Sequence, residues 1–297
     1  METDNPPLDS QLSQESPQDA DAALKPVLTR RQFLARHFAL FSAVAFGEAI
    51  GRPRLPQVTR YRLRMPGLRE PVRLLQMTDL HRSWCVSEWY LSECVRMANR
   101  LNPDIVALTG DFVTRHSEYA ISCAALLKDL RAPLGLYGTL GNHDHWSDYH
   151  TGANAVTEIL ASGASVQMLT NRSIRFDNGL RLVGIDDQWT GVPDWQKAFK
   201  GVAPSEPVIA LTHNPEQFRF MPDLPYILLA GHTHGGQINI PPLLNKIVGG
   251  KIRFLKCWFT GAKGINRMYV SRGLVVVTIP FRFNAPPEMT LFYLEPA

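Results

Sequence analysis

Gly231-His232-Thr233-His234-Gly235-Gly236-Gln237 places two imidazoles one residue apart. The stretch follows the apolar run YILLA at 226–230, which Pro225 and Gly231 flank. A short apolar run between such residues is typical of a buried strand, so the histidines are expected on the loop at its carboxyl end. In open α/β sheets ligands bind at that edge, which makes this loop the first candidate for a functional site.

The pair His232 and His234 suits a metal ion, although a plainer alternative exists. Gly231 and Gly235 carry no side-chain bulk and let the backbone turn tightly, so both rings can point into one site. On this stretch alone, one histidine could equally cap a turn while the other is a surface imidazole. The remaining strands decide between the two interpretations.

The composition is that of a globular protein with an unusual amino-terminal segment. A chain of 297 residues, 45% hydrophobic and 20% charged, can form one large α/β domain or two smaller ones. The net charge is +4, but residues 1–28 hold six acidic residues against one lysine, which leaves +9 on the rest. A basic body fits anionic lipid, nucleotide or nucleic acid. No aromatic-interleaved nucleic-acid motif is present, so no nucleic-acid partner is predicted.

The amino-terminal 50 residues are predicted to form two segments. Residues 1–28 are rich in Pro, Gln, Ser and Asp, and this composition predicts a disordered lead. In residues 29–50, Arg30-Arg31 precedes a weakly apolar stretch at 38–46, which resembles a twin-arginine (Tat) export signal. The stretch is too short for a secure spanning helix, so an uncleaved anchor and an interfacial amphipathic helix remain as alternatives.

Each of these alternatives predicts association with a bacterial cell membrane. An export signal would place the following domain on the periplasmic, extracytoplasmic side. A segment that serves only as an anchor would leave the domain at the cytoplasmic face.

The rest of the chain alternates strand-like and helical stretches, the pattern of an α/β fold. After a linker and first edge strand in 51–67, one domain is expected over 68–297. Helices are expected at 88–99, 119–130 and 153–162. Strands are expected at 72–77, 104–109, 136–140, 180–185, 208–212, 226–230, 268–270, 275–279 and 289–293.

Five of these strands end in side chains that can bind metal. An aspartate after a strand can also be a helix N-cap, and a lone histidine is often a packed residue. Five such endings at one edge of a sheet together predict a shared metal site. The residues concerned are Asp79, His81, Asp111, Asn142, His143, Asp144, His213, His232 and His234.

This ordered set resembles the signature of the calcineurin-like metallophosphoesterases. The resemblance covers the chain from about residue 70 onward and implies a four-layer αββα sandwich, in which helices flank two mixed β-sheets. It also implies two divalent metal ions. One ion would be held by Asp79, His81 and His234 and the other by Asn142, His213 and His232, with Asp111 bridging them.

The chemistry of such a pair explains these residue types. Two cations about 3.5 to 4 Å apart clamp both sides of an in-line displacement at phosphorus and generate the attacking hydroxide from a bridging water. Mixed oxygen and imidazole ligands suit manganese, the first expectation, or iron or zinc. His143 is expected to protonate the leaving oxygen or stabilise the transition state, with Asp144 orienting it or, alternatively, capping a turn. His145 matches no motif position and is expected to be a surface residue or a substrate contact.

A narrower resemblance links the chain to the bacterial membrane-associated branch that includes the YaeI and YkuE phosphodiesterases. That branch in turn resembles enzymes that hydrolyse UDP-2,3-diacylglucosamine in lipid A biosynthesis. The residues that carry it are Arg30-Arg31, Asp186-Asp187, Gly235-Gly236-Gln237-Ile238, Ser271-Arg272-Gly273-Leu274, Arg282-Phe283 and Pro287-Glu288.

The sequence thus predicts a metal-dependent hydrolase of phosphodiester or pyrophosphate bonds. A lipid-linked or nucleotide-linked substrate such as UDP-2,3-diacylglucosamine is expected. The basic and apolar segment 241–260 could meet acyl chains or a membrane surface, or instead pack on the core as a hairpin. The alternatives are the same chemistry on soluble nucleotides or phosphoproteins, and a non-catalytic scaffold, which the filled motif positions disfavour.

Overall fold

The computed structural model describes residues 29, 31, 36, 55–237, 253–276 and 282–297. By its contacts the chain divides into two compact units, Met1–Gly47 and Glu48–Ala297. In the first unit the described residues Arg31 and Arg36 are helical. The predicted segments 1–28 and 29–50 otherwise lie outside the described residues and stay predictions. Within the part of the chain that is described, no helix combines the length and apolar character needed to cross a membrane.

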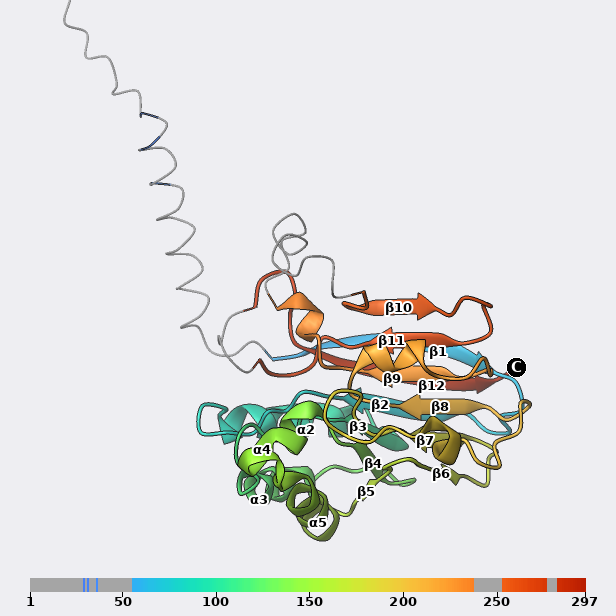
Figure 1. Cartoon of the computed structure of the whole chain (residues 1–297), viewed down its shortest axis with the longest axis horizontal. Coiled ribbons are helices and arrows are strands. Elements are labelled where there is room, and N and C mark those ends of the chain that lie inside the picture. The colour runs from blue at the N-terminus through green and yellow to red at the C-terminus, as the bar shows by residue number, and fades with distance from the viewer. Residues whose placement is uncertain (1–28, 30, 32–35, 37–54, 238–252, 277–281) are drawn as a thin grey trace, which may run out of the picture. The chain divides into compact units, whose positions relative to one another are not determined.

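Two six-stranded sheets form the second unit (Figure 1). The first contains, from edge to edge, β1 (Gln57–Met65), β12 (Glu288–Pro296), β2 (Val72–Met77), β3 (Ile105–Thr109), β4 (Leu136–Thr139) and β5 (Val166–Met168). The second contains β10 (Cys257–Thr260), β11 (Arg267–Val270), β9 (Ile227–Ala230), β8 (Val208–Leu211), β7 (Arg181–Gly184) and β6 (Arg172–Arg175).

Both sheets are mixed. Strands β2 to β5 are mutually parallel, and β12 lies antiparallel to β2. In the second sheet β7, β8, β9 and β11 are parallel, whereas the edge strands β6 and β10 are antiparallel to their neighbours. The parallel strands of each sheet therefore end at a common edge, which is where ligands bind in α/β sheets.

Helices cover the outer faces of the two sheets and complete the predicted αββα layering (Figure 1). The outer face of the first sheet packs against α2 (Glu88–Arg100), α3 (Tyr119–Leu127) and α5 (Gly152–Ala164). A shorter layer, with α6 (Trp195–Ala198) and the 3-10 helix η1 (Pro215–Arg219), covers the second sheet. The remaining helices described in the second unit, α4 (Asn142–His150) and the 3-10 turn η2 (His234–Gly236), follow strands at the candidate site.

Strand β2 shows how the sequence builds these layers. Successive side chains of a strand point to opposite faces, and Leu75 and Met77 accordingly pack under the helices while Leu74 faces the second sheet. Gln76 shares the face of Leu74, and its buried amide Nε2 donates to Ala230 O of the other sheet at 3.0 Å. The two sheets are thus joined by apolar packing and by a direct hydrogen bond.

Several elements differ from the sequence-based expectation. The expected strand 275–279 is wrong for 275 and 276, which have no strand pairing, and the remainder lies outside the described residues. Strands β5, β6 and β10 were not predicted, because each is a strand of three or four residues at a sheet edge, and β6 and β10 have no buried residue. In the described part of the segment 241–260, Phe254 and Phe259 pack on the core of the second sheet, as the hairpin alternative proposes.

The core between the sheets generates a stability prediction. Leu74 is fully buried there, so Leu74→Ala should lower the free energy of unfolding by about 2 to 5 kcal/mol through lost burial and a residual cavity. Urea unfolding followed by circular dichroism measures this. Ile121→Ala is the control, since Ile121 is 64% exposed and its loss should change stability by at most about 0.5 kcal/mol. Equal effects of the two substitutions would contradict the assignment.

Candidate active site

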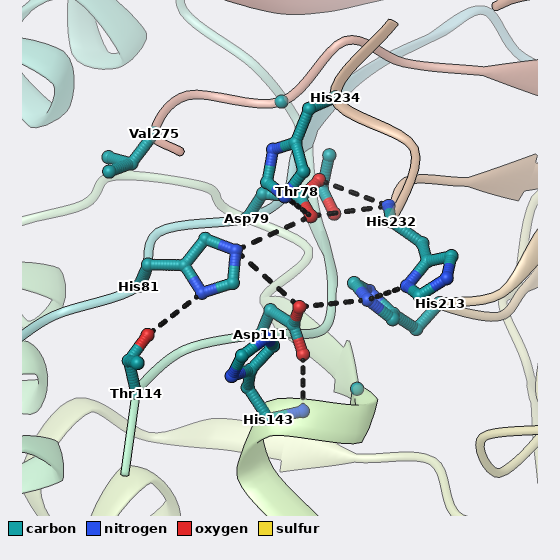
Figure 2. A network of polar contacts seen from close by, with 12 residues as sticks. Thr78, Asp79, His81, Asp111, Thr114, His143, His213, His232, His234 and Val275 are labelled. Carbon is teal, nitrogen blue, oxygen red and sulfur yellow. Dashed lines mark hydrogen bonds and ion pairs between the residues drawn. The ribbon is translucent and has the colours of Figure 1, made fainter. Parts of the chain in front are cut away.

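The predicted site residues lie on loops that leave the parallel strands of both sheets (Figure 2). Asp79 and His81 follow β2, and Asp111 follows β3. A two-residue loop after β4 leads to Asn142, the first residue of helix α4. His213 follows β8, and His232 and His234 follow β9.

The candidate ligand atoms form three overlapping groups. Within each group the nitrogen or carboxylate oxygen atoms lie within 4.8 Å of one another. Because the groups share members, they make one continuous site that both sheets contribute to. The groups are Asp79 with His81 and His234, His81 with Asp111 and His143, and Asp111 with His213 and His232.

Asp111 is at the centre of the site and is 1% exposed. Its Oδ2 lies 3.0 Å from His213 Nε2 and 3.5 Å from His81 Nε2, and its Oδ1 accepts the backbone N–H of His143 at 2.8 Å. Burial would raise the pKa of Asp111, but the charge of His213 and the hydrogen bond from its ring hold the pKa of Asp111 well below its usual range. Burial alone would lower the pKa of His213. The carboxylate of Asp111 outweighs this effect and raises the pKa of His213 to about 10.

Two hydrogen bonds orient the imidazoles on either side of Asp111. His213 Nδ1 lies 2.8 Å from the carbonyl oxygen of Thr109, which can only accept, so Nδ1 carries the hydrogen and Nε2 faces Asp111. His81 Nδ1 lies 3.0 Å from Thr114 Oγ1, which leaves Nε2 directed at the carboxylates. Partners of this kind fix the ring orientation of metal-binding histidines.

Three buried polar atoms of the site have no hydrogen-bond partner among the described residues: His81 Nε2, His234 Nδ1 and Asn142 Oδ1. Buried polar atoms are nearly always hydrogen-bonded, so unpartnered ones at a single site need an explanation. Amide oxygen and unprotonated imidazole nitrogen can each donate an electron pair to a divalent cation. These residues therefore fit a metal ion.

Burial also favours the neutral form of three of the four histidines that would bind metal, with His213 as the exception. It lowers the pKa of His81 well below its usual value, lowers that of His234, and lowers that of His232 to about 3. A histidine binds metal through the lone pair of its neutral ring. The lowered pKa values thus favour the neutral ring, which has a free lone pair, at these three positions.

The backbone at the site adopts an uncommon conformation. A positive φ is unusual for residues other than glycine, although Asp and His tolerate it better than most. Each such residue costs on the order of 1 to 3 kcal/mol and persists only when surrounding contacts impose it. The site residues concerned are Asp79 (58°), His81 (46°), Asp111 (55°), His232 (72°) and His234 (50°).

Gly231 and Gly141 allow these loops to approach one another. A Cβ on Gly231 would lie 2.6 Å from Asp79 Oδ2, and one on Gly141 would overlap Asp111 Oδ1. Both contacts are shorter than real side chains allow. The glycine before His232 is therefore required for close packing against the carboxylate of Asp79, in addition to any effect on the turn.

Asp144 has a different role from the expected orientation of His143. Its oxygens make no hydrogen bond to His143 within the described residues. They accept four backbone N–H groups at 2.8 to 3.1 Å, those of Gly141, Asp111, Phe112 and Val113. Asp144 therefore caps the start of α4 and fixes the loop that carries Asp111, as the turn-cap alternative proposes.

His145 is also placed differently from the expectation of a surface residue. Its Nε2 lies 2.8 Å from Asp186 Oδ1, and both side chains are largely buried. Burial opposes the charged ring, but the Asp186 carboxylate raises the pKa of His145 above its usual value. The pair joins α4 to the loop after β7, a connection that no sequence spacing indicates.

Arg282 connects the loop of His234 to the carboxyl-terminal region. Its guanidinium donates five hydrogen bonds, at 2.8 to 3.3 Å, to backbone carbonyl oxygens of the metal-loop residue His234 and of the carboxyl-terminal region. Burial lowers the pKa of Arg282 to about 10, so it stays charged at neutral pH. The remaining acceptors are Arg272, Gly273, Val275 and Ala285.

The model of the calcineurin-like phosphoesterase family matches residues 72–236. The chain belongs to this family. The match covers β2 to β9, which belong to both sheets, and all of the loops that carry the candidate metal ligands. The protein is accordingly a metal-dependent phosphoester hydrolase, and its two mixed sheets flanked by helices agree with the predicted fold.

Curated relatives extend the similarity beyond the family model. The uncharacterized metallophosphoesterase YkuE of Bacillus subtilis is 29% identical, over 90% of this chain and 98% of YkuE. The UDP-2,3-diacylglucosamine pyrophosphatase LpxG of Chlamydia muridarum is 26% identical, over 80% of this chain and 89% of LpxG. A transmembrane protein with metallophosphoesterase domain from Bos taurus is 30% identical over 79% of this chain, which spans 55% of that protein.

The role of Asp144 can be tested by Asp144→Asn. The amide can still accept hydrogen bonds through its oxygen, but its NH2 group would face backbone donors and leave about two buried N–H groups unpaired. The free energy of unfolding of the metal-free protein should fall by about 2 to 4 kcal/mol, as measured by urea unfolding. If Asp144 acted only by orienting His143, the variant would keep wild-type stability and lose only rate.

Proposed function

We propose that this protein hydrolyses a phosphodiester or diphosphate bond with the help of two divalent cations. The carrying observation is that two groups of candidate ligands, Asp79–His81–His234 and Asp111–His213–His232, lie in one buried site. Asp111 faces histidines of both groups. The unpartnered Oδ1 of Asn142 supports its place as a further ligand on the second side.

Two cations held by these residues would supply Lewis-acid chemistry, which offsets charge on phosphoryl oxygens and makes water a nucleophile at neutral pH. Oxygen and imidazole ligands without thiolate suit manganese, iron or zinc, and we propose manganese first. Asp111 would bridge the two sites. Its carboxylate is already held by His143 N–H and faces imidazole nitrogens on both sides, so little rearrangement is needed.

His143 is the side chain that we assign to proton transfer. Its backbone N–H is fixed on Asp111, and its ring lies 5.0 Å from that of His81, centroid to centroid, and perpendicular to it. The residue is only partly buried, so its imidazole can meet both the site and a substrate. A histidine so placed can donate a proton to the departing oxygen or a hydrogen bond to the phosphoryl group.

For the substrate, we propose a lipid-linked or nucleotide-linked diphosphate. The similarity to LpxG, whose name specifies a UDP-2,3-diacylglucosamine pyrophosphatase, supports this class. The +9 charge on the chain after residue 28 favours an anionic substrate or an anionic membrane surface. We further propose membrane association through residues 29–50. Soluble nucleotides and phosphoproteins are the second candidate class.

Metal dependence is tested first. The purified protein, stripped by chelator, should not hydrolyse bis-p-nitrophenyl phosphate, and adding Mn²⁺, Fe²⁺ or Zn²⁺ should restore turnover. UDP-2,3-diacylglucosamine and a soluble nucleotide diester, assayed in parallel, compare the two substrate classes. If no ester is hydrolysed with any of these metals, the proposed function is wrong.

His143→Ala tests the proton-transfer assignment. We expect kcat to fall by about 10²- to 10⁴-fold, the usual effect of losing a general acid, while metal content measured by plasma mass spectrometry stays at the wild-type level. His116→Ala is a matched control because His116 is 57% exposed in its side chain and pairs with Asp148, outside the site. Loss of metal in His143→Ala would instead make His143 a ligand.

A further inference from the structure

Two partly exposed tryptophans contact histidines of the site. Trp146 of α4 is 39% exposed, and its ring lies 5.4 Å from that of His143. Trp189, on the loop after β7, is 59% exposed, and its ring lies 4.4 Å from that of His232 and perpendicular to it. In Figure 2 these two histidines lie on different sides of Asp111, so the indoles adjoin different parts of the site.

The loop that carries Trp189 is held in place by two buried carboxylates. Asp187, fully buried, accepts the N–H groups of Trp189 and Thr190 at 2.9 Å. Asp186, 6% exposed, accepts the N–H of Val192 at 2.9 Å. These hydrogen bonds hold the loop in a conformation that leaves the indole of Trp189 partly exposed to solvent. Exposing so large an apolar group is unfavourable. Binding residues are often carried by loops on a rigid scaffold.

The two tryptophans belong to elements that are joined to each other. His145 precedes Trp146 on α4 and pairs with Asp186, which belongs to the loop of Trp189. The ion pair therefore restrains the distance between α4 and this loop. Trp146 and Trp189 thus provide two apolar surfaces, each next to a different histidine of the site. This arrangement is expected for a substrate that carries two organic groups.

We propose that Trp146 and Trp189 are specificity-determining walls of the active site, which select phosphodiesters bearing a large planar or apolar group on each side of the scissile phosphorus. Trp146 adjoins His143, the assigned proton donor, and so takes the leaving group. Trp189 adjoins His232 and takes the group retained on phosphorus. This inference rests on the proposed phosphodiester hydrolysis and deepens it, because only a diester carries an organic group on each side of the phosphorus.

The experiment uses the full chain loaded with Mn²⁺ and three esters that share a p-nitrophenyl leaving group. Their retained groups are methyl, phenyl and octyl. Wild-type protein should prefer the phenyl or octyl ester to the methyl ester in kcat/KM. Trp189→Ala should reduce that preference about tenfold, mainly through KM, since stacking on an aromatic side chain is worth a factor of this order. The phenyl and octyl arms distinguish a planar group from an alkyl chain.

Trp146→Ala should behave differently, because all three esters share the leaving group that it contacts. It should lower kcat/KM for the three in similar proportion. Trp189→Phe keeps an aromatic face and should retain most of the preference, which separates loss of contact from loss of folding. Trp89→Ala, at a residue 49% exposed on α2, is the matched control and should leave the rates unchanged.

The outcomes are distinguishable. A proportional loss on the methyl, phenyl and octyl esters in Trp189→Ala, or a shift of the preference in Trp89→Ala, would overturn the inference while the proposed function stands. Failure of the wild-type protein to cleave any ester with any metal would remove the proposed function and this inference with it. An altered preference in Trp189→Ala with wild-type thermal stability would support both.

Discussion

The buried carboxylate of Asp111 is the group on which the rest of the site depends. Removing a carboxylate from water costs several kcal/mol unless charged and hydrogen-bonding partners replace the solvent. The partners here are His213, His81 and the backbone N–H of His143. They follow β8, β2 and β4, which belong to different sheets. Asp111 can therefore be satisfied only when both sheets have packed together, so the charge at the site and the core between the sheets stabilise each other.

Hydrogen bonds between loop backbones tighten this coupling. Beyond Gln76, the N–H groups of Leu274 and Val275 donate to Thr78 O and Asp79 O at 3.0 and 2.9 Å, which attaches the segment after β11 to the end of β2. Arg282 holds that same segment and His234 through their carbonyl oxygens. A cation bound by Asp79 and His234 would join elements that are already connected, and such binding adds directly to the stability of the folded protein.

Much of this could be predicted from the sequence, for reasons that particular residues show. Asp79, Asp111 and His232 each follow a short apolar run, and both the run and its polar ending are local signals. Strand β6 has the sequence RSIR, with half-exposed side chains and no apolar pattern, so nothing local indicates it. The acceptor role of Asp144 depends on backbone N–H groups more than thirty residues away, which only the folded chain brings near. The pairing of His145 with Asp186 was invisible for the same reason.

Leu80 and Thr233, which separate the two ligands of each pair, help to fix the orientation of these pairs. In Asp79-Leu80-His81 and in His232-Thr233-His234, both outer residues have positive φ. Left-handed backbone at four such positions is unfavourable, so contacts of the middle residues must oppose its relaxation. Leu80 is 2% exposed and packs in the core beneath the helices, while Thr233 Oγ1 donates to Leu255 O. The middle side chains thus anchor each turn through contacts that do not involve the ligand atoms. Because these anchors belong to the protein, the orientation of the ligand pairs is set by the fold before any cation binds.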